Sequence, residues 1–178
     1  MTSKECTKCG ETKPLSEFGK HRLSHDGHAY RCKQCAREHS RAYSETPAGI
    51  WGSLNAGRRH YQKKPVLISK DDFVEWYNAQ PKKCAYCDVP EEDFILLRNR
   101  YGSRAKRLTI DSKDNSLGYE AGNMVLACER CNFIKSNILS FDEMRYIGQN
   151  FIKPKWQALK RGELTESIYL KKHWRNRN

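Results

Sequence analysis

Four Cys-x-x-Cys pairs constrain the fold of this chain more than any other feature of its sequence. The pairs use all eight cysteines, so no thiol is left over. Two such pairs together supply four thiolates, the tetrahedral ligand set that structural zinc prefers. We expect pairs that are neighbours in the sequence to share an ion, which gives two structural Zn2+ per chain. The expected ligand sets are Cys6, Cys9, Cys32 and Cys35, and Cys84, Cys87, Cys128 and Cys131.

Disulfide bonds are the weaker explanation for these cysteines. The first residues lack the apolar segment of a secretory signal peptide, and no stretch approaches the roughly 20 apolar residues of a membrane span. We therefore expect a cytoplasmic protein without a membrane partner, in a compartment that keeps thiols reduced. Nearby histidines could replace a thiolate of the first set, but with four cysteines available we expect them to face solvent or phosphate. They are His21, His25, His28 and His39.

The composition favours a small, metal-stapled protein that binds a polyanion. The 178 residues carry a formal net charge of +12, and only 38% of them are hydrophobic. A mean hydropathy of −0.89 argues against one large apolar core, and small polar cores usually need metals or disulfides. The basic excess points to nucleic acid. We expect four parts: a zinc module at 1–45, a helical connector at 46–80, a core with the second cysteine set at 81–140, and a C-terminal helix with a basic tail at 141–178.

Two serine capping boxes, at 69–72 and 140–143, predict where helices begin. The first helix is expected over 71–79. The second is expected to continue until Pro154 interrupts it, because proline removes a backbone donor and clashes with the preceding turn. The apolar face of this second helix is predicted to contain Met144, Ile147 and Phe151.

The segment between the halves of the second cysteine set predicts a hairpin with a helix folded over it. Residues 108–111 alternate like a short strand that ends in a carboxylate, and residues 124–127 form a second strand after a turn-rich loop. A helix then begins at the last cysteine pair. This arrangement brings Asp111, at the end of a strand, close to Asn132, in the first turn of the helix.

Residues 108–137, LTIDSKDNSLGYEAGNMVLACERCNFIKSN, resemble the core of the HNH nucleases, in the branch of that family that carries CxxC pairs. The resemblance implies a small zinc-stabilised α+β protein with a ββα-metal core, an N-terminal four-cysteine module and helical connectors. It also implies a metal-dependent endonuclease that hydrolyses phosphodiester bonds in double-stranded DNA at specific sequences, of restriction or phage type, in a bacterium or a phage-infected host. The oligomeric state stays open, and a homodimer is one option.

Three residues match positions that serve the metal site of that family. Asp111 matches the aspartate that ends the first strand, Asn123 the asparagine that fixes the loop, and Asn132 the last residue of the motif. The resemblance therefore implies that Asp111 and Asn132 hold a catalytic Mg2+ or Mn2+ together with the scissile phosphate. It also implies that Asn123 braces the loop by hydrogen bonds.

Ser112 departs from the family, which has its general-base histidine at this position. A hydroxyl is a far poorer proton acceptor than an imidazole at neutral pH, so another group must activate the attacking water or attack itself. Tyr86 is the first candidate, because zinc would hold its knuckle beside Asn132, and a nearby dication and arginines favour the phenolate. His60, in the basic connector, is the second. The base stays open, as does the alternative of a zinc protein that binds DNA without cutting it.

Basic residues interleaved with tyrosines predict contacts to DNA phosphates, although they could also be solubilising surface. Lys135 lies three residues after Asn132 on one helical face and is expected either to touch a phosphate or to be a solvated charge. An RNA-binding zinc protein is a third hypothesis, without a supporting stacking motif. The two basic clusters contain Arg58, Arg59, Lys63, Lys64, Arg98, Arg100, Arg104, Lys106 and Arg107.

Overall fold

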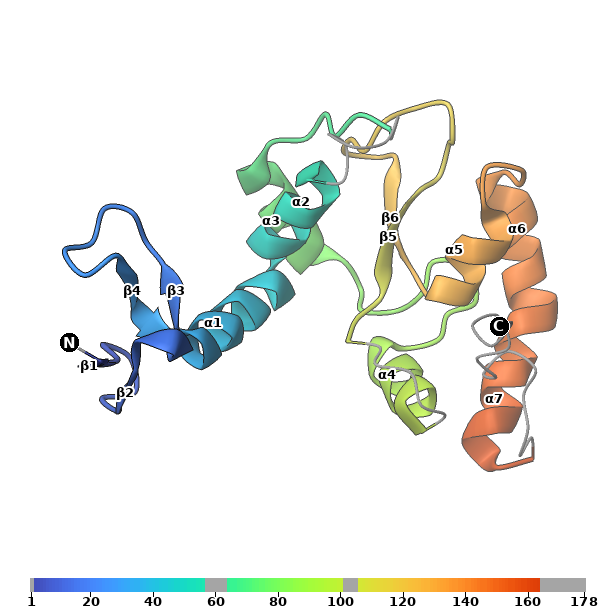
Figure 1. Cartoon of the computed structure of the whole chain (residues 1–178). Coiled ribbons are helices and arrows are strands. Elements are labelled where there is room, and N and C mark those ends of the chain that lie inside the picture. The colour runs from blue at the N-terminus through green and yellow to red at the C-terminus, as the bar shows by residue number, and fades with distance from the viewer. Residues whose placement is uncertain (1, 57–63, 101–105, 164–178) are drawn as a thin grey trace, which may run out of the picture. The chain divides into compact units, whose positions relative to one another are not determined.

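The computed structural model describes residues 2–56, 64–100 and 106–163. The chain divides into two compact units, Met1–Ser53 and Leu54–Asn178, and both mix helices with short strands (Figure 1). The mixed α+β class expected from the sequence is therefore confirmed. The finer division into four parts stays a prediction. None of the helices in the described ranges combines the length and the apolar character that crossing a bilayer needs.

The first unit is built from two antiparallel hairpins around a very small core. This core consists of Phe18 and the buried cysteines of the first set, Cys6, Cys32 and Cys35. One aromatic ring and three thiols bury little apolar surface for a unit of this size. A bound metal would therefore contribute more to the stability of this unit than its apolar core does. The elements are β1 (Ser3–Glu5), β2 (Thr12–Pro14), η1 (Leu15–Glu17), β3 (Phe18–Lys20), β4 (His28–Cys32), α1 (Lys33–Glu45) and α2 (Pro47–Ala56), which ends beyond the unit boundary.

Helix α1 is an element that the sequence analysis did not predict. It begins directly after β4, where Cys32 Sγ accepts a hydrogen bond from Cys35 N at 3.5 Å. Cys35 is the single buried residue of this helix. Its few apolar residues, Cys35, Ala36, Ala42 and Tyr43, recur at helical spacing, but they lie in a run that is polar overall, so the helix is easily taken for a solvated segment.

The second unit contains the predicted hairpin together with helices before and after it. Both serine caps are confirmed: Ser69 Oγ accepts a hydrogen bond from Asp72 N, and Ser140 forms a complete capping box with Glu143. The elements are α3 (Lys70–Ala79), α4 (Glu91–Arg100), β5 (Thr109–Ser112), β6 (Met124–Ala127), α5 (Glu129–Lys135), α6 (Phe141–Ile147), η2 (Gly148–Ile152) and α7 (Lys153–Arg161).

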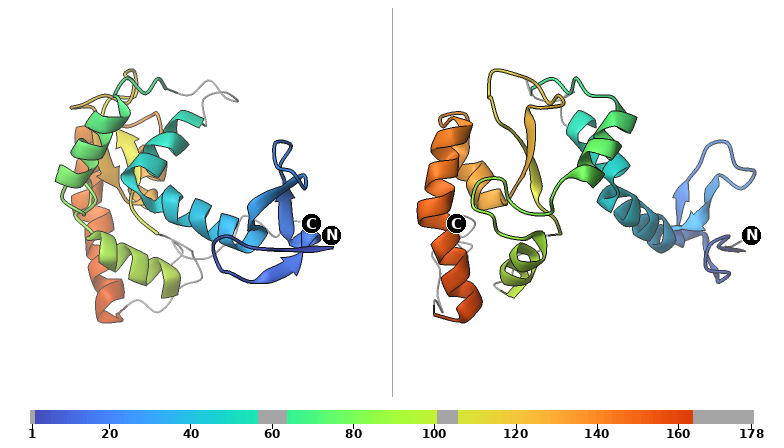
Figure 2. Two further views of the ribbon diagram at one scale, coloured as in Figure 1. Left: turned by 90° about the vertical axis from the view of Figure 1, so that its left-hand side faces the viewer. Right: turned by 180° about the vertical axis from the view of Figure 1, so that it is seen from behind.

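Strands β5 and β6 pair in antiparallel fashion, with Asp111 opposite Val125 and Ser112 opposite Met124. The second strand has the predicted bounds, and the first is shifted by one residue. The expected alternation of burial is absent, because the last three residues of β5 and all of β6 are buried. Helix α5 packs against both strands (Figure 2). The end of β5 is thus enclosed, and its polar side chains lie in the interior.

The prediction that Pro154 interrupts the C-terminal helix is wrong. Helix α6 continues through η2, a π-helical turn, into α7, and the three elements form one rod (Figure 1). Pro154 lies in the first turn of α7, where a missing N–H costs little. The wider π turn also changes the buried face, because Ile152 is buried whereas Phe151 is 56% exposed.

Candidate active site

The structure brings the eight cysteines together in two groups of four, which follow the expected pairing of sequence neighbours. Within each group the sulfur atoms all lie within 4.8 Å of one another. Cys87 Sγ and Cys128 Sγ are 3.8 Å apart, which matches the edge of a tetrahedron with Zn–S bonds of about 2.3 Å. All eight cysteines are free thiols. Either group could therefore hold Zn2+.

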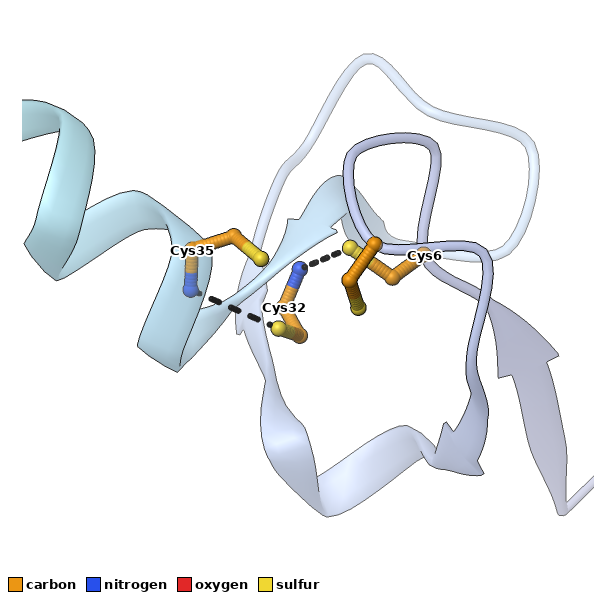
Figure 3. A group of neighbouring side chains, drawn as sticks. Cys6, Cys32 and Cys35 are labelled. Atoms are coloured by element: carbon orange, nitrogen blue, oxygen red, sulfur yellow. Dashed lines mark hydrogen bonds between the residues drawn. The ribbon is translucent and has the colours of Figure 1, made fainter.

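The first group joins the start of the chain to the start of α1 (Figure 3). Cys9 is exposed and the other three cysteines are buried. Cys32 N donates a hydrogen bond to Cys6 Sγ at 3.2 Å. This bond is the main reason why the pKa of the Cys6 thiol is lowered to about 6. A thiol of low pKa is readily available as a thiolate ligand.

The second group is fully buried and connects the loop that carries Tyr86 to the start of α5. The C-terminal rod holds the backbone of this loop. Arg145 donates to the carbonyl oxygen of Ala85, and Gln149 Nε2 donates to that of Tyr86 at 2.7 Å. Gly148 lies so close that a Cβ at this position would be 2.6 Å from the carbonyl carbon of Tyr86. The loop is therefore fixed by the cysteine group on one side and by the rod on the other.

Asp111 lies at the centre of the candidate site and is buried. Tyr86 Oη donates a hydrogen bond to Asp111 Oδ2 at 2.8 Å, and Ser112 N donates to Asp111 Oδ1 at 2.9 Å. Burial raises the pKa of Asp111, although Tyr86, Lys135 and Ser112 each act to lower it. Burial and the charge of Asp111 also raise the pKa of Tyr86. The groups described around Tyr86 thus favour the protonated phenol, and the phenolate expected from the sequence has no support from them.

Helix α5 crosses the same face of β5 that carries Asp111. Asn132 Nδ2 donates to Thr109 Oγ1 at 3.0 Å, and Lys135 Nζ is 3.8 Å from Asp111 Oδ2. Thr109 and Asp111 point to the same side of the strand because they are two residues apart. Asn132 therefore lies over Thr109, and Lys135, one helical turn later, lies over Asp111.

The alternative that Lys135 is a solvated charge is wrong, and its burial leaves no exposed ammonium group for the predicted contact with a DNA phosphate. Its side chain is 0% exposed, and Lys135 Nζ donates to Asn115 Oδ1 at 3.0 Å. The residue three positions after Asn132 shares its helical face, and this face is turned towards the hairpin. Lys135 is an internal partner of Asp111 and Asn115.

Ser112 is also fully buried, and its hydroxyl has a partner that sequence reasoning missed. Lys64 Nζ donates to Ser112 Oγ at 2.6 Å and to Asn115 Oδ1 at 2.7 Å. In the sequence Lys64 belongs to a basic cluster, and Asn115 lies in the turn-rich loop between the two predicted strands. Ser112 and Asn115 follow Lys64 by 48 and 51 residues in the sequence. No local pattern could therefore have predicted that they meet.

Asn123 braces the loop between the two strands. Its Nδ2 donates to the carbonyl oxygen of Gly118 at 2.8 Å and to that of Asp114 at 3.1 Å. In return Asp114 N donates to Asn123 Oδ1 at 2.8 Å. The side chain thus satisfies backbone groups on both sides of the turn.

The remaining site predictions fall outside the centre or outside the described residues. Lys106 is exposed and Arg107 is partly exposed, just before β5. Arg98, which the sequence analysis placed in a surface cluster, is 9% exposed and forms an ion pair with Glu129. The predicted residues that lie outside the described ranges are Arg58, Arg59, His60, Lys63 and Arg104.

A divalent cation would find few protein ligands at Asp111. In the described ranges, the only groups of three or more cysteine, histidine or carboxylate ligands are the two cysteine groups. Asp111 offers a carboxylate, and Asn132, whose Nδ2 is engaged with Thr109, offers its amide oxygen. A small set of hard oxygen donors fits Mg2+, which keeps several waters and is usually completed by substrate phosphates.

Comparisons with known proteins give one informative relative. No protein-family model matches the chain, and no curated protein does. Among solved structures, the chain matches PacI, described as a rare-cutting HNH restriction endonuclease, with 28% sequence identity and a TM-score of 0.54. The match covers 91% of this chain and 99% of PacI. In fold and in sequence, the chain is therefore similar to an HNH restriction endonuclease.

Proposed function

We propose that this protein is a metal-dependent endonuclease that hydrolyses phosphodiester bonds in double-stranded DNA at specific sequences. The observation that carries the proposal is the buried Asp111–Tyr86 hydrogen bond, which joins the end of β5 to the loop of the second cysteine group. A carboxylate and a phenol held in a polar interior are typical of a site prepared for chemistry. The similarity to PacI supplies the reaction class.

Each residue of the site has a proposed role. Asp111 and Asn132 hold Mg2+ or Mn2+, which when bound stabilises negative charge on the scissile phosphate. Tyr86 directs its hydroxyl at Asp111 and stays our first candidate for activating the attacking water or attacking itself. Asn123 keeps the loop in place, and His60 stays the second candidate for the base. Zinc in the two cysteine groups fixes the scaffold.

The test is cleavage of plasmid DNA with Mg2+ or Mn2+, against a control with EDTA. Asp111→Ala and Asn132→Ala should abolish cleavage and leave DNA affinity and zinc content largely unchanged, because these oxygens serve the catalytic ion. Asp71→Ala is a matched control, since Asp71 is an exposed carboxylate on α3. Cleavage by Asp111→Ala at the rate of the unsubstituted protein would contradict the proposed metal site.

Ser112 favours a second candidate function, a zinc protein that binds DNA without cutting it. The hydroxyl at this position accepts a hydrogen bond from Lys64 and cannot take the part of an imidazole base. DNA binding without cleavage under either metal, in zinc-loaded protein, would select this function over the first.

A further inference from the structure

Two lysine ammonium groups converge on a single amide oxygen beside Asp111. Asn115 Oδ1 accepts hydrogen bonds from Lys64 Nζ at 2.7 Å and from Lys135 Nζ at 3.0 Å. Ser112 Oγ accepts a second bond from Lys64 at 2.6 Å. Two like charges around one neutral oxygen repel each other, so a negative charge beside them is favourable.

The fold places Lys64 at this point through its own backbone. Leu67 N donates to the carbonyl oxygen of Tyr119 at 2.8 Å, and Tyr119 N donates to that of Pro65 at 2.7 Å. Gly118 permits this approach, because a Cβ there would be 2.5 Å from the carbonyl oxygen of Pro65. The segment that begins at Lys64 is thus attached to the loop between β5 and β6.

The loop is the same one that Asn123 braces, since Asn123 Nδ2 donates to the Gly118 carbonyl oxygen. Asn123, Gly118 and Pro65 therefore form a continuous connection from the brace to Lys64. These backbone contacts therefore fix where the Lys64 side chain begins.

The two ammonium groups of this cluster have two carboxylates nearby, so binding of an anion at Lys64 depends on its hydrogen bonds and on the partners that those carboxylates already have. Asp111 faces Lys135, and the nearby Asp114 accepts hydrogen bonds from the backbone N and the hydroxyl of Ser116. An ammonium group has three N–H donors, and Lys64 uses two of them on neutral oxygens. Burial, followed by the charge of Lys135, lowers the pKa of Lys64, although Asp111 and Asp114 act in the opposite direction. The carboxylates nearby thus do not fully offset the unfavourable environment of Lys64.

We propose that Lys64, held by Ser112 and Asn115, forms a phosphate-binding subsite that takes a non-bridging oxygen of the DNA strand presented to Asp111. That the ligand is DNA rests on the proposed function. The position of the subsite rests on the contacts of Lys64. The subsite gives Ser112 a purpose. A short hydroxyl accepts a bond from Lys64, whereas the larger histidine of the HNH family would occupy that space and repel the ammonium when protonated.

The test uses inorganic phosphate as the probe and the NMR signals of lysine side chains as the readout, in zinc-loaded protein with EDTA absent and no Mg2+ added. Phosphate should shift the Lys64 Nζ and Cε signals saturably. Lys70, an exposed lysine at the start of α3, is the internal control and should show only a small, non-saturating change. Ser112→Ala should weaken the binding several-fold, because it removes one of the two acceptors that hold Lys64, while the reporter signal is kept.

A short DNA duplex should displace the phosphate from Lys64. In cleavage assays Lys64→Gln should slow the reaction by about 10- to 100-fold, the range of one charge-assisted hydrogen bond, and Lys64→Arg should recover part of the rate. Absence of a saturable Lys64 shift, or a shift equal to that of Lys70, would overturn the subsite. These measurements are independent of cleavage: uncut plasmid contradicts the proposed function, whereas an unperturbed Lys64 contradicts the subsite alone.

Discussion

Replacing Gly148 with alanine should destabilise the protein, although the same change inside a helix normally stabilises it by about 1 kcal/mol. Gly148 is buried in η2, and the new Cβ would lie 2.6 Å from the carbonyl carbon of Tyr86 and 3.1 Å from Cys87 N. Both neighbours are backbone atoms of the loop held by the second cysteine group, so neither can rotate away. Overpacking of this kind costs about 1–3 kcal/mol, which leaves a net loss of up to about 2 kcal/mol.

For a chain of this length, each 1 kcal/mol lowers Tm by about 2–4 °C. The assay is thermal unfolding followed by circular dichroism at a fixed excess of zinc. The matched control is Gly52→Ala in α2, where a Cβ would have nothing within 4 Å and should stabilise by about 0.5–1 kcal/mol. Because the overlap also displaces Tyr86 from Asp111, Gly148→Ala should cleave DNA more slowly. A Tm for Gly148→Ala equal to or above that of the unsubstituted protein would refute the close contact.

Three further outcomes are expected. Native mass spectrometry should find two zinc ions per chain, and strong chelation should unfold the protein, because metal binding supplies folding free energy; intramolecular disulfides in place of zinc would contradict this. Tyr86→Phe should slow cleavage by about 10- to 100-fold, because Asp111 loses a charge-assisted hydrogen-bond donor. The control Tyr146→Phe, at an exposed ring, should cleave at the unsubstituted rate. Full activity of Tyr86→Phe would leave His60 as the candidate base. Replacing Lys106 and Arg107 by glutamine should reduce the slope of log affinity against log salt by about 2, and an unchanged slope would assign both residues to general surface.

Features that depend on neighbouring residues could be predicted from the sequence. The CxxC spacing, the serine caps at 69 and 140 and the strand Met124–Ala127 each follow from chemistry within a few positions, and the structure has all of them. Helix α1 was not predicted, although its apolar residues recur at helical spacing, because the run is polar overall and buries only Cys35.

Long-range partners could not be predicted in the same way. The face of α5 that carries Lys135 was recognised, but only the packing of the helix shows that this face is turned inward. Lys64 and Ser112 belong to distant segments that are joined by a backbone bridge between Val66 and Tyr119. Neither segment has a hydrophobic pattern that predicts this pairing. The resemblance to HNH nucleases located Asp111 correctly at the end of a strand, yet it gave no indication that a lysine would occupy the space beside Ser112.

The second cysteine group has a consequence for the order in which the protein acquires its site. Cys87 and Cys128 are 41 positions apart, so joining their segments closes a loop at an entropic cost of about 3 kcal/mol plus a constant term. In the proposed zinc-bound protein, the ion that closes this loop also sets Tyr86 against β5 and starts the helix that carries Asn132. A growing or metal-starved chain would therefore lack the assembled site, and the proposed nuclease activity would begin only when folding of the second unit and metal uptake are complete.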